Sequence, residues 1–174
     1  MRREHLLHLL VELAERFGRS EFYVIGSSAI LASIPDSADA TLLQSRDADI
    51  VPTDEDEGLI DQISWVLGEG SDFEVRHGYY AQGVSGRTAQ YAPTDWRSRT
   101  IPLSVAGYRA HCMEPHDLLL AKLGAGRQKD LEFARAAVKA LPIRREILLR
   151  RLTEVAADAQ TLVLIEARVR GLFA

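Results

Sequence analysis

Two aspartates separated by one residue, Asp47 and Asp49, are the side chains of this chain best suited to chemistry. They open a short apolar run, Ala48 to Val51, which predicts a β-strand. Because side chains alternate between the two faces of a strand, both carboxylates are expected on one face. Carboxylate oxygens are the ligands that Mg²⁺ prefers, and two of them can complete an octahedron with phosphate oxygens and waters. The pair predicts a metal site for Mg²⁺ or Mn²⁺, unless one aspartate pairs with Arg46 and the other only lies at a strand edge.

A turn upstream of the aspartates has the composition of a phosphate site. Phe22 to Ile25 predicts a short buried strand that ends at Gly26. Ser27 or Ser28 can then cap a following helix. A helix N-terminus exposes free backbone N–H groups and the positive end of the helix dipole, which favour a phosphate. We therefore expect phosphate and metal to meet at one place.

A third group of candidate residues lies far along the chain. Pro115 predicts the start of a helix, and Gly124 and Gly126 predict its end. A second helix follows, and the turn between the two can bring together four side chains: Lys122, Arg127, Lys129 and Asp130. Lysine offers a point charge to an anion and arginine a forked donor. The alternative is a structural ion pair, such as Lys122 with Asp130, that caps two helices.

The order of these pieces resembles the nucleotidyltransferase superfamily related to polymerase beta, in which a Gly-Ser turn is followed by Asp-x-Asp. The stretch PHDLLLAKLGAGRQKDLEFA is similar to one bacterial branch, akin to the AbiEii and MenT toxin nucleotidyltransferases. The resemblance covers roughly Phe22 to Leu141. It implies transfer of a nucleoside monophosphate from an NTP to a hydroxyl, with metal on Asp47 and Asp49.

The same resemblance implies roles for the remaining candidates. Gly26, Ser27 and Ser28 would bind the nucleotide. Lys122 would contact triphosphate oxygens, joined by Arg127 or Lys129, and Asp130 would act near the nucleophile or the metal. A toxin-like role is also implied, with tRNA or a protein as acceptor and a cognate antitoxin protein as partner.

The sequence departs from the superfamily in one respect. Many members place a third aspartate on a neighbouring strand, but GRTAQYAPTDW offers none before Asp95, which follows Pro93 on a predicted turn. Either two acids suffice, another acid comes from elsewhere, or activity is lost. The last case gives the alternative function, a catalytically impaired module of the same fold that binds a nucleotide or a protein.

Two other enzyme classes are disfavoured. Haloacid-dehalogenase-like phosphatases need an apolar strand before Asp-x-Asp, whereas TLLQSR precedes it here. His116 and Asp117 lack the further ligands of metal phosphohydrolases and are expected mainly at a helix start. No Gly-x-Ser-x-Gly, Gly-x-Gly-x-x-Gly or Walker sequence occurs.

Composition bounds the location and the partners. The net charge of −4 does not indicate a nucleic-acid binder, although Arg127 to Arg151 holds eight bases and three acids, which suits either an anionic substrate or a solvated helix face. One cysteine, Cys112, allows no disulfide within the chain, so the cytoplasm is expected. His8, Glu12 and Glu15 interrupt the N-terminal apolar run, and no signal peptide or membrane helix is expected.

The element pattern predicts an α/β (α+β) fold with a mixed sheet flanked by helices and a helical C-terminal part. Residues 1–113 are expected to form the nucleotidyltransferase-like core, and residues 114–174 a helical part packed on it as one unit. The expected elements begin with an amphipathic helix ending at Gly18, a helix through Ile30 ended by Pro35, and a loop from Pro35 to Ser45 that admits substrate. Thr53 precedes a helix through Trp65 and Leu67 with acids in its first turn, and Phe73 to Met113 predicts an antiparallel extension or set of hairpins, with a turn at Ala106-Gly107. A helix over Arg127 to Ala140 and one or two helices after Pro142 follow.

Overall fold

A five-stranded mixed sheet, seen in a computed structural model that describes residues 1–34 and 39–174, organises the chain. The strand order is β3-β2-β1-β5-β4. β1 is antiparallel to β2 and parallel to β5, β3 is parallel to β2, and β4 is antiparallel to β5. The strands are β1 Glu21–Ile25, β2 Asp47–Pro52, β3 Tyr80–Gly83, β4 Ile101–Val105 and β5 Tyr108–Cys112. The predicted mixed sheet is confirmed.

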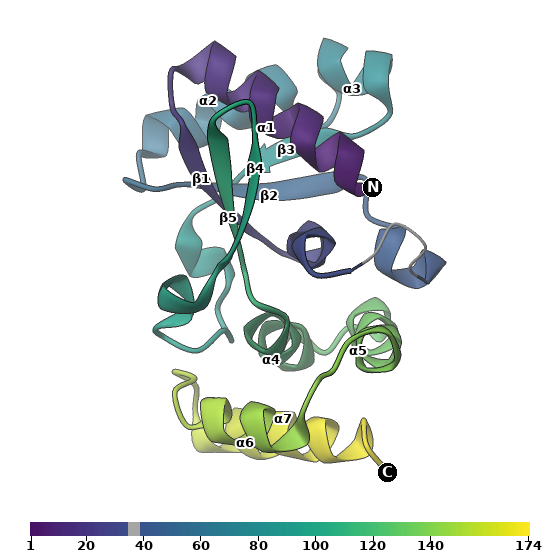
Figure 1. Ribbon diagram of the computed structural model, residues 1–174. Coiled ribbons are helices and arrows are strands. Elements are labelled where there is room, and N and C mark those ends of the chain that lie inside the picture. The colour runs from purple at the N-terminus through teal and green to yellow at the C-terminus, as the bar shows by residue number, and fades with distance from the viewer. Residues whose placement is uncertain (35–38) are drawn as a thin grey trace.

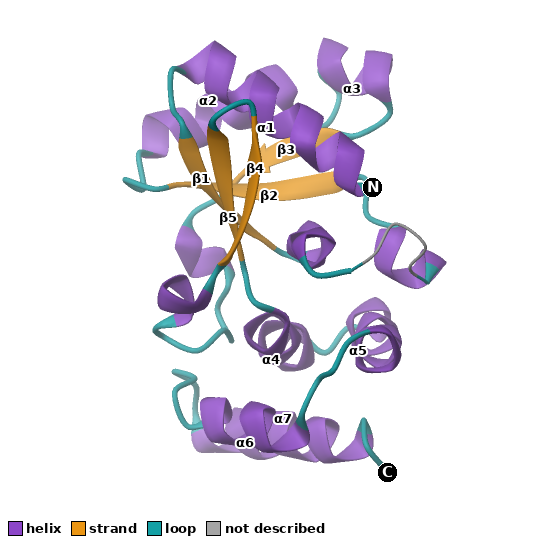
Figure 2. Cartoon of the chain, in the orientation of Figure 1, coloured by secondary structure: helices purple, strands orange, loops and turns teal. Residues whose placement is uncertain are grey.

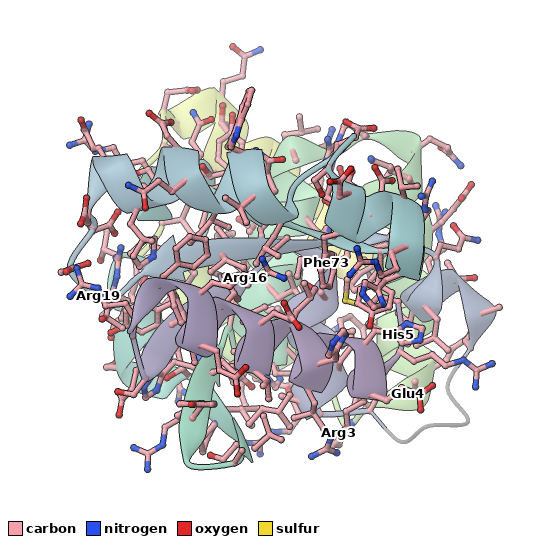
Figure 3. The ribbon with its side chains drawn as sticks, turned by 90° about the horizontal axis from the view of Figure 1, so that it is seen from above. Arg3, Glu4, His5, Arg16, Arg19 and Phe73 are labelled. Carbon is pink, nitrogen blue, oxygen red and sulfur yellow. The ribbon has the colours of Figure 1, made fainter. Side chains whose placement is uncertain are left out.

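Helices lie on both sides of this sheet in Figure 1. Its upper side carries α1, α2 and α3, and α4 to α7 lie below it, with α6 and α7 farthest away. Seen from above, α1 and α2 run side by side (Figure 3). The α-helices are α1 Arg3–Phe17, α2 Glu57–Leu67, α3 Asp72–His77, α4 Pro115–Ala125, α5 Gln128–Ala140, α6 Arg145–Leu152 and α7 Ala159–Gly171. Short 3₁₀ turns complete the set (Figure 2): η1 Ser27–Ala32, η2 Ala40–Leu43, η3 Gly86–Thr88 and η4 Trp96–Arg99.

Several predicted elements are confirmed, together with the residues that were expected to begin or end them. α1 buries a leucine stripe and ends at Gly18, whose φ of 65° is the left-handed conformation that glycine adopts most easily. The hairpin of β4 and β5 turns at Ala106 and Gly107, both with positive φ, as a tight hairpin requires. α4 begins at Pro115 and ends before Gly126, and two helices follow Pro142.

The segment after Gly26 differs from its prediction. It is a six-residue 3₁₀ helix whose N-cap is Gly26, so neither Ser27 nor Ser28 caps it with a side chain. A short 3₁₀ segment lacks the long column of aligned peptides that gives an α-helix its dipole, which weakens that part of the phosphate prediction. The predicted loop from Pro35 to Ser45 lies partly outside the described residues, and its later part contains η2. The predicted end at Pro35 also lies outside them.

Two further element predictions were wrong. α2 begins four residues after Thr53, with Asp56 as its N-cap, because Glu55 adopts φ 54° and interrupts the helix. Glu57 is the acid in its first turn. Phe73 lies in α3, and β3 pairs in parallel with β2 rather than in a hairpin, because the helical crossover returns the chain to the same end of the sheet.

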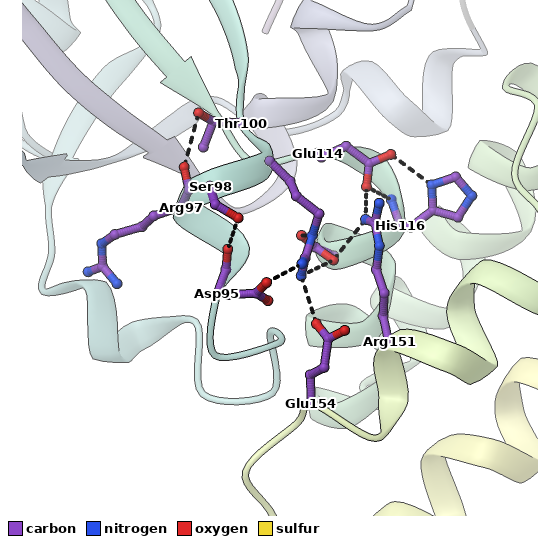
Figure 4. A network of polar contacts seen from close by, with 10 residues as sticks. Asp95, Arg97, Ser98, Thr100, Glu114, His116, Arg151 and Glu154 are labelled. Atoms are coloured by element: carbon purple, nitrogen blue, oxygen red, sulfur yellow. Dashed lines mark hydrogen bonds and ion pairs between the residues drawn. The ribbon is translucent and has the colours of Figure 1, made fainter.

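A buried polar network joins α4 and α6 to the segment before β4 (Figure 4). Asp117 is fully buried, and its carboxylate accepts hydrogen bonds from Arg99 Nε at 2.9 Å and Arg151 Nη1 at 2.9 Å. Arg99 also donates to Asp95 and Glu154, at 2.6 and 3.1 Å. Asp117 lies in the first turn of α4, as expected. Its carboxylate pairs with two arginines there. None of the helices formed by residues 1–34 and 39–174 is long and apolar enough to cross a membrane.

Candidate active site

The Gly-Ser turn and the aspartate pair meet at the adjoining ends of β1 and β2. Asp49 pairs with Ile25, the residue before Gly26, in the antiparallel β1–β2 register. A Cβ atom placed on Gly26 would lie 2.0 Å from Asp49 Oδ2. Gly26 also adopts φ 66°, so both the space and the backbone require glycine there. The predicted convergence of these two motifs is therefore present in the fold.

Asp49 is a half-buried carboxylate next to a second carboxylate. Burial and the neighbouring charge of Asp47 raise the pKa of Asp49 to about 6. Lys122, Arg127 and Lys129 oppose that rise through their positive charge. Within the described part of the chain, its carboxylate receives no side-chain hydrogen bond. A site of this kind stabilises a bound divalent ion, because the ion removes the cost of a buried negative charge.

Asp47 lies on the same face of β2 as Asp49, two residues away. Its carboxylate accepts a hydrogen bond from the Ser45 hydroxyl. The alternative pairing with Arg46 is not found, because Arg46 donates to Glu74 Oε1 at 2.6 Å and to the Gly78 carbonyl at 3.1 Å. Arg46 is thus engaged with the α3 region, and the Asp47 carboxylate is left facing the cavity.

Lys122 connects the C-terminal helices to the turn. Its Nζ donates to Ser27 Oγ at 2.6 Å and lies 3.2 Å from Asp130 Oδ1. It also lies 5.0 Å from the centre of the Phe133 ring. Burial lowers the pKa of Lys122, although the opposing charge of Asp130 works to raise it. The ion pair predicted as the structural alternative is therefore present, and it lies directly beside the Gly-Ser turn.

Asp130 is held by two cations at the start of α5. Arg127 donates to it through Nε at 2.6 Å and Nη2 at 3.2 Å. Burial opposes ionisation of Asp130, but the bonds from Arg127 and Lys122 outweigh it and keep the pKa of the carboxyl below its usual range. At neutral pH the group is a carboxylate with its oxygens committed to these cations.

The Lys122–Asp130 pair borders two cavities, and both of these residues line each of them. The larger has a volume of about 340 Å³ and the smaller about 130 Å³. The larger is lined by Ser27, Ser45, Asp47, Tyr80 and Lys129 among others. The smaller is lined by Gly26, Asp49, Thr88 and Arg127 among others. Ser28 is buried and lines neither of them.

No third carboxylate joins the aspartate pair from the neighbouring strand. The β2–β3 register places Gln82 opposite Asp49, and the amide of Gln82 donates to Ser64 Oγ at 2.9 Å. Asp95 belongs instead to the Arg99 network. Across residues 1–34 and 39–174, no group of three or more His, Cys, Asp or Glu side chains is arranged to hold a metal. A metal here would rely on two aspartates, with other positions supplied by substrate and water.

Sequence inspection missed several polar residues of the cavities: Thr41, Gln44, Ser45, Glu69, Tyr80 and Thr88. Ser45 precedes Asp47 by two positions, so a strand alternation extended backwards indicates it. Tyr80 is opposite Asp47 in the β2–β3 register, and burial and the charge of Asp47 raise the pKa of its hydroxyl. Thr88 is brought to the smaller cavity by the segment after β3. Tyr80 and Thr88 have no local sequence signal, because strand register and the path of a loop bring them to the cavities.

The mixed sheet, the glycine turn and the carboxylate pair on the adjacent strand are compatible with a nucleotidyltransferase-like fold. A sequence model of the family described as "Nucleotidyltransferase of unknown function (DUF6036)" matches residues 4–170. The chain belongs to this nucleotidyltransferase family. Neither a curated protein nor a solved structure matched the chain. The predicted superfamily is confirmed, and the likeness to the AbiEii and MenT branch stays a prediction.

Proposed function

We propose that this protein transfers a nucleoside monophosphate from an NTP to a hydroxyl acceptor in the cytoplasm. One observation carries the proposal: Lys122, from a distant segment, bonds to the Gly-Ser turn and lines both the cavity that contains Asp47 and the cavity that contains Gly26 and Asp49. The acceptor hydroxyl would lose its proton to solvent water as its oxygen bonds to the α-phosphorus, while the bond from that phosphorus to the α,β-bridging oxygen breaks. Pyrophosphate leaves with that electron pair.

Each residue has a role that follows from its chemistry. Asp47 and Asp49 would hold Mg²⁺ or Mn²⁺, an ion that neutralises phosphate charge when bound. The fit rests on Asp49, whose half-buried carboxylate lies against a glycine and has a raised pKa. Lys122 would contact triphosphate oxygens, and Asp130 would hold its ammonium group in position.

The remaining nucleotide-binding candidates lie around the same pair. Gly26 and Ser27 would face the phosphates, with Ser27 Oγ already bonded to Lys122 Nζ. Ser28 would contribute through its backbone only, because its side chain is buried. Arg127 would serve the smaller cavity and Lys129 the larger.

Incubation with labelled NTPs, Mg²⁺ and either total tRNA or cell lysate tests the transfer. We expect label on a macromolecule with wild-type protein and its loss with the double substitution Asp47→Ala, Asp49→Ala. Asp61→Asn serves as the matched control, because Asp61 is an exposed acid on α2. Label that persists in the double variant would place the reaction elsewhere.

A second candidate function is a binding module without turnover, favoured by the absence of a neighbouring-strand carboxylate opposite Asp49. Calorimetric titration with NTP separates the two. NTP binding without product supports the module, and binding with product supports the enzyme. Absence of any binding would count against both.

The acceptor and the biological setting follow from family likeness. We place tRNA or a protein as acceptor, and a toxin-like role with a cognate antitoxin as partner. Expression without a partner should then slow growth, and the double aspartate substitution should relieve that effect. Equal growth with both proteins would contradict the toxin role and leave the transfer reaction to be judged by its own assay.

A further inference from the structure

The turn between α4 and α5 receives an arginine from the last helix. Arg168 of α7 donates through Nη1 to the Leu123 carbonyl at 2.5 Å and to the Gly124 carbonyl at 3.4 Å. These carbonyls belong to the final turn of α4, where the helix itself leaves acceptors unpaired. A guanidinium at this end also meets the negative end of the helix dipole. Arg168 is therefore a tertiary cap for α4.

Gly126 is shaped to receive that guanidinium. It adopts φ 63° as the residue after α4, and a Cβ atom on it would lie 2.1 Å from Arg168 Nη1. Any side chain at position 126 would therefore displace the arginine. The left-handed backbone and the close approach of Arg168 both depend on glycine at this one position.

The opposite side of the same turn is also packed. A Cβ atom on Gly124 would lie 2.2 Å from Cγ of Tyr91, a residue of the segment between β3 and β4. Tyr91 and Arg168, which come from different parts of the chain, thus pack closely against Gly124 and Gly126. The end of α4 has little freedom to move relative to the rest of the molecule.

This turn sets the geometry of the candidate site. The Lys122 carbonyl accepts from the Gly126 N–H at 2.9 Å, so the capped turn includes the backbone of Lys122. Arg127 is the N-cap residue of α5, and Asp130 lies in the first turn of that helix. A shift of the turn would change the distance between Lys122 and Asp130, because one lies on each side of it.

We propose that Arg168 is a positioning residue that holds the α4–α5 turn and thereby aligns Lys122 with Asp130 and the Gly-Ser turn. The catalytic consequence rests on the proposed function. Arg168 is absent from the residues that line the two described cavities, so it acts through the backbone of α4. The last helix, which the sequence predicts only as one of the helices after Pro142, thereby becomes part of the framework of the candidate site.

Three variants test the role. Arg168→Met keeps the apolar stem and removes the donors, and Arg168→Lys keeps the charge without the forked donor. Arg170→Met is the matched control, because Arg170 is on the same helix and pairs with Glu166 at 2.7 Å in an exposed position. The unfolding midpoint of each variant is measured first. If Arg168→Met does not fold, Arg168→Lys decides the question.

The first readout does not depend on turnover. NMR titration of the Asp130 carboxyl reports how closely Lys122 and Arg127 approach it. We expect its pKa to rise toward the ordinary range in Arg168→Met, to rise less in Arg168→Lys, and to match wild type in Arg170→Met. An unchanged Asp130 titration in a folded Arg168→Met protein would overturn the proposal.

The second readout is nucleotidyl transfer. Misplacement of a positioning framework by about 1 Å can cost about a hundredfold in rate, so kcat/KM should fall by that order in Arg168→Met. Arg168→Lys should recover part of the loss, and Arg170→Met should stay within about twofold of wild type. Full activity in Arg168→Met would contradict the proposal. If wild type transfers nothing, the proposed function fails, and the Asp130 titration alone decides the role of Arg168.

Discussion

Asp49 shows how a carboxylate in the candidate site opposes stability at the scale of one residue. The side chain is half-buried beside Gly26, next to a second negative charge, and its pKa is raised to about 6. A folded protein that holds an ionised group against burial loses stability, and the loss is recovered only when a cation binds. The same geometry that disfavours the metal-free carboxylate favours a metal complex.

Asp49→Asn should stabilise the metal-free protein at neutral pH. The folded pKa of about 6 lies above the ordinary value of an aspartate, so the folded state binds the proton more tightly. Stability from this group is complete below pH of about 4 and is lost as pH rises past about 6. The substitution should raise the unfolding free energy by about 1–3 kcal/mol at pH 7.5, and less at pH 5, in denaturant titrations with chelator. An exposed replacement, Asp61→Asn, should change little, and destabilisation by Asp49→Asn would contradict the account.

Metal binding should weaken in mild acid. Because Asp49 must lose its proton to ligate the ion, Mn²⁺ affinity should fall about fourfold between pH 7.5 and pH 5.5, from the change in ionised fraction. Calorimetry at the two pH values measures this fall. Equal affinity at both would indicate that Asp49 is not a ligand. The Asp61→Asn protein should keep the wild-type dependence.

At the scale of elements, the β1–η1 turn decides whether the site can form. Gly26 links a buried strand to a 3₁₀ helix and lets the backbone pass directly against Asp49. Ser27, one residue later, accepts a hydrogen bond from Lys122 of α4. The Gly26-Ser27 turn thus contacts β2 and α4 at once, so an atom added to it should disturb both contacts.

Gly26→Ala should damage both stability and activity, and the chain offers a control. Gly18 has nearly the same φ, 65° against 66°, but a Cβ atom on it would meet nothing within 4 Å. Gly18→Ala should therefore lower the free energy of unfolding only by the cost of the left-handed backbone, about 1–2 kcal/mol. Gly26→Ala adds a clash with Asp49 and should cost about 1–3 kcal/mol more, with loss of NTP-dependent labelling. Equal unfolding free energies for the two variants would rule out the close contact.

At the scale of the whole molecule, buried charge joins the sheet to the C-terminal helices. Asp117 pairs with Arg99 from the segment before β4 and with Arg151 from α6. A bridge between Pro93 and Val155 adds a backbone link between the same regions. We therefore predict that the expected core, residues 1–113, and the expected helical part, residues 114–174, unfold together as one unit.

Asp117→Asn should destabilise the protein by about 3 kcal/mol, because it leaves two arginines partly uncompensated in a buried setting. The control is Glu166→Gln, which removes an exposed pair with Arg170 and should cost under about 1 kcal/mol. Chemical denaturation followed by circular dichroism and tryptophan fluorescence measures both changes. A small effect of Asp117→Asn would show that Asp95, Glu114 and Glu154 suffice to balance the arginines.

Local chemistry predicted much of the fold. The leucine stripe of α1, the apolar run of β1, the Ala106-Gly107 turn and the Pro115 helix start are all short-range signals, and the structure confirms them. The start of α2 and the helix at Phe73 were missed because caps and a single positive φ at Glu55 decide such boundaries. The direction of β3 was also missed, because the length of a connection does not show at which end of the sheet the next strand begins.

The sequence by itself determined the residue types of the site: a glycine-serine turn, alternate carboxylates on a strand, and a lysine and aspartate on either side of a glycine turn. Only the tertiary structure decided that Gly26 touches Asp49, that Lys122 reaches Ser27, and that Arg168 caps the end of α4. The reason is physical. Spacing along a strand or helix specifies which side chains share a face, whereas contacts between segments nearly a hundred residues apart depend on how the faces pack.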